Sequence, residues 1–191
     1  VTATFRSAYP AEGGDSYGGL PQLVEDSMRI AEPRIVVFQD LDEPPSAATY
    51  GEVMATTFQS FGFAGLITSG AARDIEQVRK MRFPCWASSV NVSHGYCHFL
   101  ASNLPVIVGG LQIKPGDLLH ADANGIVNIP HSIADEVVEL CHPFMEAEQV
   151  VIDYLRSGKE TPKGFRQLID SMSKRFGELR ERAQRVKKAT S

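Results

Sequence analysis

The adjacent residues Arg73 and Asp74 are the part of this 191-residue chain whose side chains best suit chemistry. A guanidinium offers a rigid fork of donors to a carboxylate, and a neighbouring aspartate can hold a hard divalent cation. Together they could grip a small oxo acid through an ion pair and a metal ion. Arg-Asp pairs also occur as surface ion pairs that contribute little to stability. The elements around this pair therefore decide whether it is functional.

Alternating strands and helices are predicted on both sides of the pair. Strands are expected at 1–5, 34–38 and 64–68, and helices at 20–31 and 51–61. The second helix begins behind Gly51, has Gly62 as a natural stop, and should bury one face, made by Val53, Met54, Thr57, Phe58 and Phe61. Asp74 is placed to cap a short helix that runs to Met81.

Short strands follow from residue 85 onward. They are predicted at 85–90 and from Pro105 to Val108, with a tight turn at 114–117. Asn124-Gly125 predicts a hairpin between 118–122 and 126–129, because both residues tolerate positive φ. A helix from Ser132 should be interrupted by Pro143 and resume to Leu155, before a tail helix begins near residue 161. The Gly-rich segment 11–19 is not assigned to an element.

Composition indicates one sizeable core with an appendage, since 43% of the residues are hydrophobic and 22% are charged. No apolar run approaches the roughly 20 residues that cross a bilayer, so no membrane span is expected. The three cysteines lack a C-x-x-C pair, which favours reduced thiols in a cytoplasmic protein. The chain opens with a valine on a strand-like run, so we expect it to begin partway through its domain.

Charge separates the tail from the rest of the chain. Residues 163–188 carry nine basic and three acidic residues, although the whole chain has a net charge of -4. Apolar residues recur there at the three- and four-residue spacing of a helical stripe: Phe165, Leu168, Ile169, Met172, Phe176, Leu179, Ala183 and Val186. Packing against the acidic body or a neighbouring subunit is the preferred interpretation, and nucleic-acid binding is the minor one.

Two histidine pairs have spacings that metal ligands use. His94 and His98 stand four residues apart, but the glutamate of a zinc-protease motif is absent between them. We interpret them as surface or packing histidines near a strand end. His120 and Asp122 lie on the same side of a predicted strand, where a structural polar network is expected.

Two longer segments carry a family resemblance: GEVMATTFQSFGFAGLITSGAARDIEQV, followed by VSHGYCHFLASNLPVIVGGLQIKPGDLLHADANGIVNIP. They resemble the family of regulator of ribonuclease activity A (RraA) and the 4-hydroxy-4-methyl-2-oxoglutarate aldolases. The resemblance implies an α/β fold, a swivelling β/β/α layered sandwich, over residues 1–130, with C-terminal helices over 131–191. It also implies homotrimers or pairs of trimers, and a family N-terminal part that precedes Val1.

The resemblance assigns roles to particular residues. It makes Arg73 the substrate-binding and catalytic arginine and Asp74 the ligand of a divalent metal, Mg²⁺ first and Mn²⁺ second. Gly51, Glu52, Val53 and Met54 would bind substrate through backbone amides, as a helix N-terminus can. Glu52 would also act in catalysis beside the metal's waters. Gln77 replaces an acid of the family pattern, and Glu76 comes one residue early, so we expect Glu76 to miss the outer metal shell.

The implied activity is that of a metal-dependent lyase on 2-oxo acids. It would cleave 4-hydroxy-2-oxo acids by a retro-aldol reaction, decarboxylate oxaloacetate, or both, through a pyruvate enolate. The alternative on the same scaffold is a non-catalytic protein-binding regulator that inhibits a ribonuclease, because fold alone does not decide function.

Overall fold

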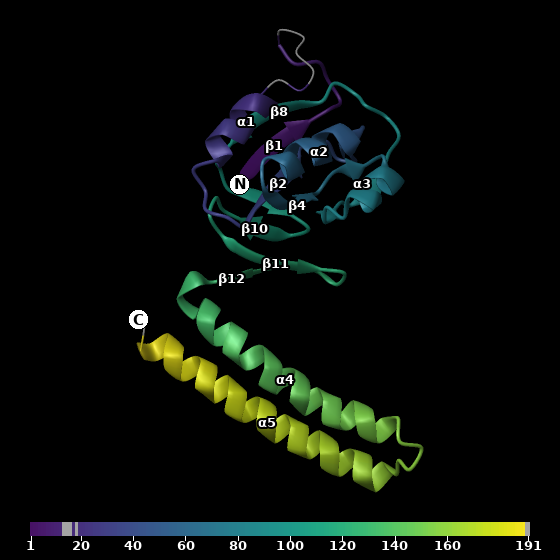
Figure 1. The fold of residues 1–191 in the computed structure, drawn as a ribbon, viewed down its shortest axis with the longest axis vertical. Coiled ribbons are helices and arrows are strands. Elements are labelled where there is room, and N and C mark those ends of the chain that lie inside the picture. Colours follow the sequence, from purple (N-terminus) through teal and green to yellow (C-terminus); the bar gives the residue numbers. More distant parts are fainter. Residues whose placement is uncertain (13–16, 18, 190–191) are drawn as a thin grey trace. The chain divides into compact units, whose positions relative to one another are not determined.

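The computed structural model describes residues 1–12, 17 and 19–189, with backbone only for 186–189 (Figure 1). Residues 13–16 and 18 of the Gly-rich segment lie outside the described residues. The chain divides into two compact units, Val1–Asp117 and Leu118–Ser191. This division precedes the domain boundary at 130 that the sequence predicts, and it groups the hairpin at 118–129 with the C-terminal helices.

The first unit has the mixed α/β pattern that the sequence predicts. Its elements in chain order are β1 (Thr2–Arg6), α1 (Leu20–Ser27), β2 (Arg34–Asp40), β3 (Ala48–Tyr50), α2 (Glu52–Ser60), β4 (Phe63–Thr68), β5 (Ala71–Ala72), α3 (Ile75–Met81), β6 (Cys85–Trp86), β7 (Ser89–Val90), β8 (His98–Ser102), β9 (Val106–Val108) and β10 (Leu111–Ile113).

Among the described residues this unit has three sheets: the β9-β10 pair and two larger sheets that position the candidate site. The larger sheet has the order β6-β4-β2-β1-β8, with β8 antiparallel to β1 and the other neighbours parallel. The smaller sheet, β3-β5-β7, is wholly parallel. In it Tyr50 pairs with Ala72, so the next residues of both strands, Gly51 and Arg73, emerge side by side. The parallel pairing of these two short strands therefore positions the candidate site.

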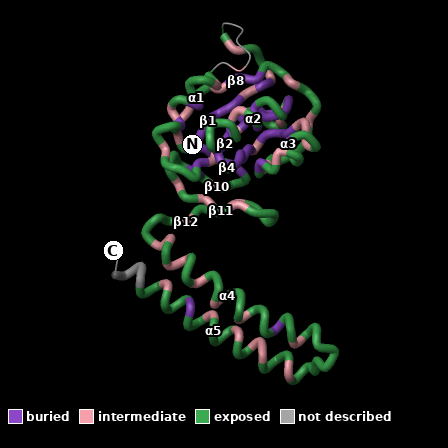
Figure 2. The backbone as a smooth tube through the Cα atoms, in the orientation of Figure 1, coloured by how far each residue is buried: buried purple, intermediate pink, exposed green. Residues whose placement is uncertain are grey.

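The core of the unit lies between the larger sheet and its helices, and Figure 2 shows the buried backbone concentrated in β1, β2 and β4. Phe58 of α2 packs against Phe38 of β2 and Phe63 of β4, with ring centroids 5.7 and 4.9 Å apart. These contacts hold α2 against the sheet, so the start of α2 is firmly positioned.

Two predictions for the helices were wrong in detail. The buried face of α2 is centred on Met54, Ala55 and Phe58, whereas Val53 and Phe61 are 70% and 50% exposed. Val53 lies about 100° around the helix from Met54, which is enough to turn it outward. Helix α1 ends at Ser27 instead of residue 31, because Met28 and Ile30 bond in tighter turns to the carbonyls of Glu25 and Ser27.

The second unit consists of β11 (Leu118–Asp122), β12 (Gly125–Ile129), the 3₁₀ turn η1 (His131–Ile133), α4 (Ala134–Leu155) and α5 (Pro162–Ala189). The predicted hairpin is confirmed, but its turn is shifted by one residue. Asp122 pairs with Gly125, so Ala123 and Asn124 form the loop. The Asp122 side chain accepts a hydrogen bond from the Asn124 N–H (2.7 Å). This Asx contact stabilises the turn, which therefore does not need a positive φ at Asn124.

Helix α4 is continuous through Pro143, contrary to the predicted interruption. An internal proline costs about 3 kcal/mol in an isolated helix, so contacts with α5 must offset it. The rings of Phe144 and Phe176 stack with centroids 4.2 Å apart and planes 4° apart. Arg182 also pairs with Glu136 (3.0 Å) and Glu139, which lie two turns and one turn before the proline, respectively. These contacts hold α4 straight on both sides of Pro143.

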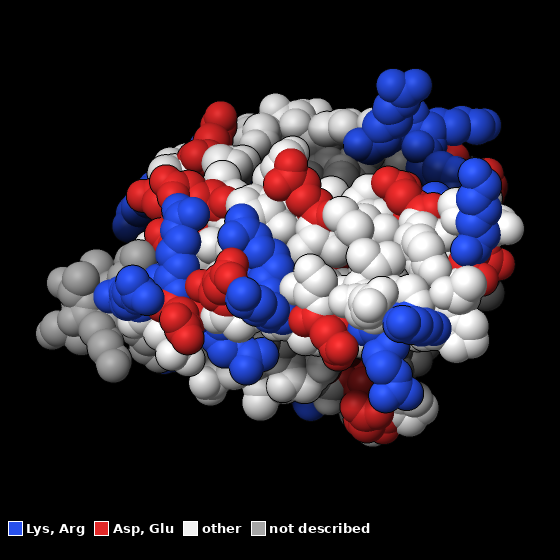
Figure 3. Space-filling view, turned by 90° about the horizontal axis from the view of Figure 1, so that it is seen from below, with Lys and Arg blue, Asp and Glu red and all other residues white. Residues whose placement is uncertain are grey.

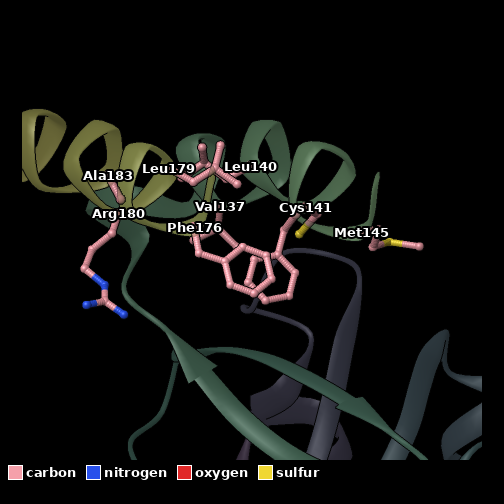
Figure 4. A pocket seen from close by; sticks show the side chains of 9 residues that line it. Val137, Leu140, Cys141, Met145, Phe176, Leu179, Arg180 and Ala183 are labelled. Atoms are coloured by element: carbon pink, nitrogen blue, oxygen red, sulfur yellow. The ribbon is translucent and has the colours of Figure 1, made fainter. Parts of the chain in front are cut away.

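The basic tail helix packs along α4 as a two-helix hairpin. Helix α4 carries six Asp and Glu and no Lys or Arg, whereas α5 carries nine Lys and Arg and three Asp and Glu. On the face seen in Figure 3, positive and negative side chains intermingle. An apolar pocket of about 440 Å³ opens between the helices and includes Leu140, Phe144, Phe176 and Leu179 (Figure 4). Within the described residues, no helix is long and apolar enough to span a membrane.

Asp42 is a buried carboxylate that anchors the segment after β1. It is 8% exposed, accepts hydrogen bonds from the N–H groups of Ser7 (2.7 Å) and Ala8 (2.8 Å), and pairs with Arg6 (3.3 Å). We expect Asp42→Ala to lower the free energy of unfolding by about 3 kcal/mol, because buried donors lose their acceptor. Urea denaturation checks this. Asp42→Asn keeps an acceptor and should lower the free energy of unfolding by about 1 kcal/mol. An Asp42→Ala variant as stable as the wild type would contradict the prediction.

Candidate functional site

The candidate site lies where β3 and β5 end. Gly51 and Arg73 follow the paired residues Tyr50 and Ala72, and the Arg73 N–H donates to the Tyr50 carbonyl at 3.0 Å. Helix α2 starts at Glu52 and helix α3 at Ile75, so both helices begin at this point. The structure therefore brings the predicted loop at Gly51 and the Arg73-Asp74 pair together. Side-chain groups and backbone amides meet at the carboxyl ends of parallel strands, a common place for ligand binding.

Asp74 joins the two halves of the site. It is the residue before α3, as predicted, but its side chain does not cap that helix. Its Oδ2 instead accepts a hydrogen bond from the Glu52 N–H at 2.9 Å, at the start of α2. The same oxygen is 3.8 Å from Nε of Arg73. Asp74 has φ 55° and ψ 37°, a left-handed conformation that aspartate tolerates better than most residues.

Gly51 leaves the space that the Arg73 and Asp74 side chains occupy. A Cβ at this position would lie 2.5 Å from Oδ2 of Asp74 and 2.8 Å from Nε of Arg73. The backbone of Gly51 is extended, with φ -143°, which any residue can adopt. The site therefore needs glycine here for its missing side chain and not for its backbone conformation.

The start of α2 contributes backbone more than side chains. Helix geometry leaves the N–H groups of Val53 and Met54 without an acceptor inside the helix, next to the positive end of its dipole. The Met54 side chain is buried and that of Val53 points outward, so neither side chain shapes the site. Glu52 is exposed, and its N–H is already bound to Asp74. These amides could receive a carboxylate group of a ligand.

The residues fit a divalent cation held by one protein carboxylate. The Asp74 side chain is 37% exposed, and within the described part of the chain its Oδ1 makes no hydrogen bond. The described residues contain no cluster of three or more His, Cys, Asp or Glu that could enclose a metal. Mg²⁺ commonly keeps several waters and takes one or two protein carboxylates plus ligand oxygens, so such a site suits it. Glu76 pairs with Arg79 at 2.9 Å on the exposed surface.

Tyr17 and His94 also belong to the site, although no sequence pattern marked Tyr17. The Tyr17 hydroxyl lies 2.6 Å from Nε2 of His94 and is close enough to Arg73 for the guanidinium to lower its pKa. The two rings meet edge to face with centroids 5.0 Å apart. The Tyr17 N–H donates to the Cys97 carbonyl at 2.8 Å, which fixes the backbone of Tyr17. Only the tertiary fold could reveal this contact, because 77 residues separate the two rings.

Burial raises the pKa of Tyr17, and charge on Cys97 and Asp74 adds to this increase, while Arg73 opposes it. The hydroxyl is therefore protonated at neutral pH, with a cation and an imidazole as its neighbours. Burial also raises the pKa of the Cys97 thiol, whose Sγ donates to the His94 carbonyl. Cys97 is thus a packing residue of this cluster and not a thiolate nucleophile.

The histidine pairs have structural partners within the fold. Nδ1 of the buried His98 lies 2.7 Å from the Tyr96 carbonyl, while His94 contacts Tyr17. The two histidines thus bond to separate groups, as the packing interpretation predicts. In the second unit, Nε2 of His120 lies 3.8 Å from Oδ2 of Asp122, so the expected polar pair is present. The apolar pocket between α4 and α5 includes one charged side chain, Arg180, and one free thiol, Cys141.

Comparisons with known proteins place the chain in a family. A model of the RraA-like family (Aldolase/RraA) matches residues 15–128. A curated relative from Halalkalibacterium halodurans has the provisional name 4-hydroxy-4-methyl-2-oxoglutarate aldolase and is 28% identical over 127 residues. That match covers 66% of this chain and 58% of the relative, so the chain spans less than two thirds of the relative's length.

Solved structures show the same fold. A crystal structure of an uncharacterized protein from Pseudomonas syringae pv. tomato matches with a TM-score of 0.61 and 20% identity, over 87% of this chain and 74% of that one. RraAS2 of Streptomyces coelicolor, described as an unusual member of the RNase ES inhibitor RraA family, has a TM-score of 0.58 and 24% identity, over 78% and 73%. These neighbours confirm the predicted fold class. Since the family model also covers more than half of the chain, the chain belongs to the RraA-like family (Aldolase/RraA).

Proposed function

We propose that the chain is a divalent-metal-dependent lyase that acts on 2-oxo acids through a pyruvate enolate. Its reactions would be retro-aldol cleavage of 4-hydroxy-2-oxo acids, decarboxylation of oxaloacetate, or both. The observation that carries the proposal is the space at Gly51, which lets Oδ2 of Asp74 bind the Glu52 N–H while it lies 3.8 Å from Nε of Arg73. The aldolase names within the family support a lyase at the family level.

Asp74 would hold the cation, Mg²⁺ first and Mn²⁺ as the alternative. Bound there with the 2-oxo and carboxylate oxygens of a substrate, the cation would polarise the carbonyl and favour the enolate. The Glu52 N–H binds Oδ2 of Asp74, so Oδ1 is the oxygen proposed to bind the cation. Asp74 is therefore oriented by the protein before any ligand binds.

Arg73 would bind and stabilise the negative charge that develops on the substrate. Its side chain is 27% exposed, so one side of the guanidinium faces a ligand while Asp74 and Tyr17 hold the other. The N–H groups of Val53 and Met54 would receive a substrate carboxylate at the positive end of α2. A donor aimed at developing charge typically contributes about 3 kcal/mol to transition-state stabilisation.

Retro-aldol cleavage needs two proton transfers: one from the 4-hydroxyl group, and one to the enolate carbon. Glu52 is the proposed acceptor of the first proton, because it is a carboxylate at the start of α2 and is open to water. Its exposed side chain can pass that proton to solvent. We further propose that the protein assembles as a homotrimer or a pair of trimers in the cytoplasm.

Asp74→Asn is the sharpest test of the metal-dependent activity. Asparagine keeps an oxygen that can accept the Glu52 hydrogen bond and tolerates the left-handed backbone, but it loses the negative charge. We expect magnesium-dependent pyruvate release from oxaloacetate and 4-hydroxy-4-methyl-2-oxoglutarate to fall on the order of a hundredfold, while thermal unfolding changes little. Asp74→Ala should lose the activity too.

Release is measured with Mg²⁺, with Mn²⁺ and with a chelator. An Asp74→Asn variant as active as the wild type would reject the metal role of Asp74. If the folded wild-type protein releases no pyruvate from either substrate, the protein-binding regulator becomes the better description of the chain.

A further inference from the structure

A tyrosine and a histidine contact each other beside the proposed substrate-binding arginine. The Tyr17 hydroxyl lies 2.6 Å from Nε2 of His94, and it is close enough to the Arg73 guanidinium for that charge to act on the Tyr17 pKa. A group whose pKa responds to the Arg73 charge lies near the place where Arg73 would bind an anion. The pair therefore adjoins the site but is absent from the residues that the family resemblance assigns.

The contacts of His94 define its tautomer. Nδ1 lies 3.1 Å from the Gly95 carbonyl, which can only accept, so Nδ1 carries a proton. In neutral His94 the other nitrogen, Nε2, must then accept the Tyr17 proton. When His94 is protonated, Nε2 donates to the Tyr17 oxygen and leaves the hydroxyl proton of Tyr17 free to point away from the ring.

The backbone keeps this pair in place. Tyr17 is tied to the Cys97 carbonyl, and Gly95 sits where a Cβ would approach the Ala47 Cβ to 2.7 Å and the Ser7 carbonyl to 2.9 Å. Gly95 also has φ +58°, which favours glycine at this turn. The tightly packed turn at Gly95 and the backbone hydrogen bond of Tyr17 to Cys97 together hold the two rings edge to face.

We propose that Tyr17 is the acid that protonates the enolate carbon, and that His94 positions Tyr17 and replaces its proton. This inference rests on the proposed function. In the step, the O–H bond of Tyr17 breaks as a C–H bond forms at C3 of the enolate, and the enolate electron pair becomes that bond. The Tyr17 oxygen takes the Nε2 proton of protonated His94, which ends neutral with Nδ1 still bound to Gly95. Water supplies the proton that His94 carries.

Three features suit this role. The raised pKa of Tyr17 keeps the hydroxyl protonated, so it can act as a donor. Arg73 stabilises negative charge that develops on the Tyr17 oxygen during transfer. The assignment also gives the two proton transfers to different groups, because Glu52, at the start of α2, is proposed for the hydroxyl proton and Tyr17 for the carbon proton.

The test is exchange of pyruvate methyl protons for deuterium, followed by proton NMR with Mg²⁺ present. Exchange requires the same proton transfer at C3 in reverse. We expect Tyr17→Phe to slow exchange on the order of a hundredfold, since positioned acid-base groups contribute about that much or more. Tyr9→Phe is the matched control, because Tyr9 is 68% exposed, and it should exchange at the wild-type rate. Oxalate, a planar mimic of the enolate, should bind Tyr17→Phe within about threefold of the wild-type affinity.

His94→Ala tests the relay separately from packing. It should slow exchange on the order of tenfold or more, and added imidazole should restore part of the rate, which a purely structural role for His94 would not allow. Wild-type exchange rates in both Tyr17→Phe and His94→Ala would overturn this inference but would not contradict the proposed lyase function. If the wild-type protein neither exchanges pyruvate protons nor releases pyruvate, the lyase fails, and this inference fails with it.

Discussion

Arg73→Ala is expected to lower kcat/KM for magnesium-dependent pyruvate release by at least a hundredfold, which corresponds to about 3 kcal/mol of transition-state stabilisation. The guanidinium is the positive side chain at the ends of β3 and β5, and it is held by Asp74 and Tyr17. Its loss would remove the charge that is proposed to stabilise the enolate. Steady-state kinetics with oxaloacetate as substrate measure the change.

Arg73→Lys separates charge from geometry. Lysine keeps the positive charge but lacks the planar fork, so we expect it to recover only part of the activity and to remain about tenfold below the wild type. Arg79→Ala is the control, because Arg79 pairs with Glu76 on the exposed surface of α3, where both side chains are 71% exposed. Turnover that is the same in Arg73→Ala and in the wild type would exclude Arg73 from the chemistry.

Gly51→Ala is the second substitution with a large expected effect. The added methyl group would meet Oδ2 of Asp74 at 2.5 Å and Nε of Arg73 at 2.8 Å, both closer than side chains tolerate. Since the backbone of Gly51 is extended, the clash is relieved mainly by displacing those two side chains. We expect pyruvate release to fall on the order of a hundredfold, because a displacement of about 1 Å in a site has effects of that size.

The matched control is Gly177→Ala in α5. A Cβ at Gly177 meets nothing within 4 Å, and alanine in a helix is more stable than glycine by about 1 kcal/mol. Gly177→Ala should therefore keep full activity and raise the melting temperature slightly. Isothermal titration with oxalate and Mg²⁺ would show whether Gly51→Ala has lost binding as well as turnover. Full activity in Gly51→Ala would show that the site does not depend on the approach of Asp74 to α2.

Patterns of residue types over short stretches of the sequence were enough to predict most elements of the fold. Strands β1, β2 and β4, the tail helix and the hairpin at 118–129 follow from apolar spacing and from turn residues, which act within a few positions of the chain. Predictions from these sequence patterns were wrong where contacts between distant residues outweighed local conformational preference. Pro143 stays within α4 because Phe176 and Arg182 of α5 hold the helix on both sides. The Val53 side chain points outward because the sheet packs against the opposite face of the helix, made by Met54, Ala55 and Phe58.

The sequence by itself determined which chemical groups could meet: the adjacent Arg73 and Asp74, and a glycine loop that opens a helix. The tertiary structure alone decided how they meet. The pairing of Tyr50 with Ala72 sets Gly51 beside Arg73, and Asp74 then binds the Glu52 N–H 22 residues earlier. The contact of Tyr17 with His94, 77 residues apart, also comes from tertiary packing. Spacing along the chain encodes neighbours on one helix or strand, whereas contacts between elements depend on sheet pairing and packing, which no local pattern specifies.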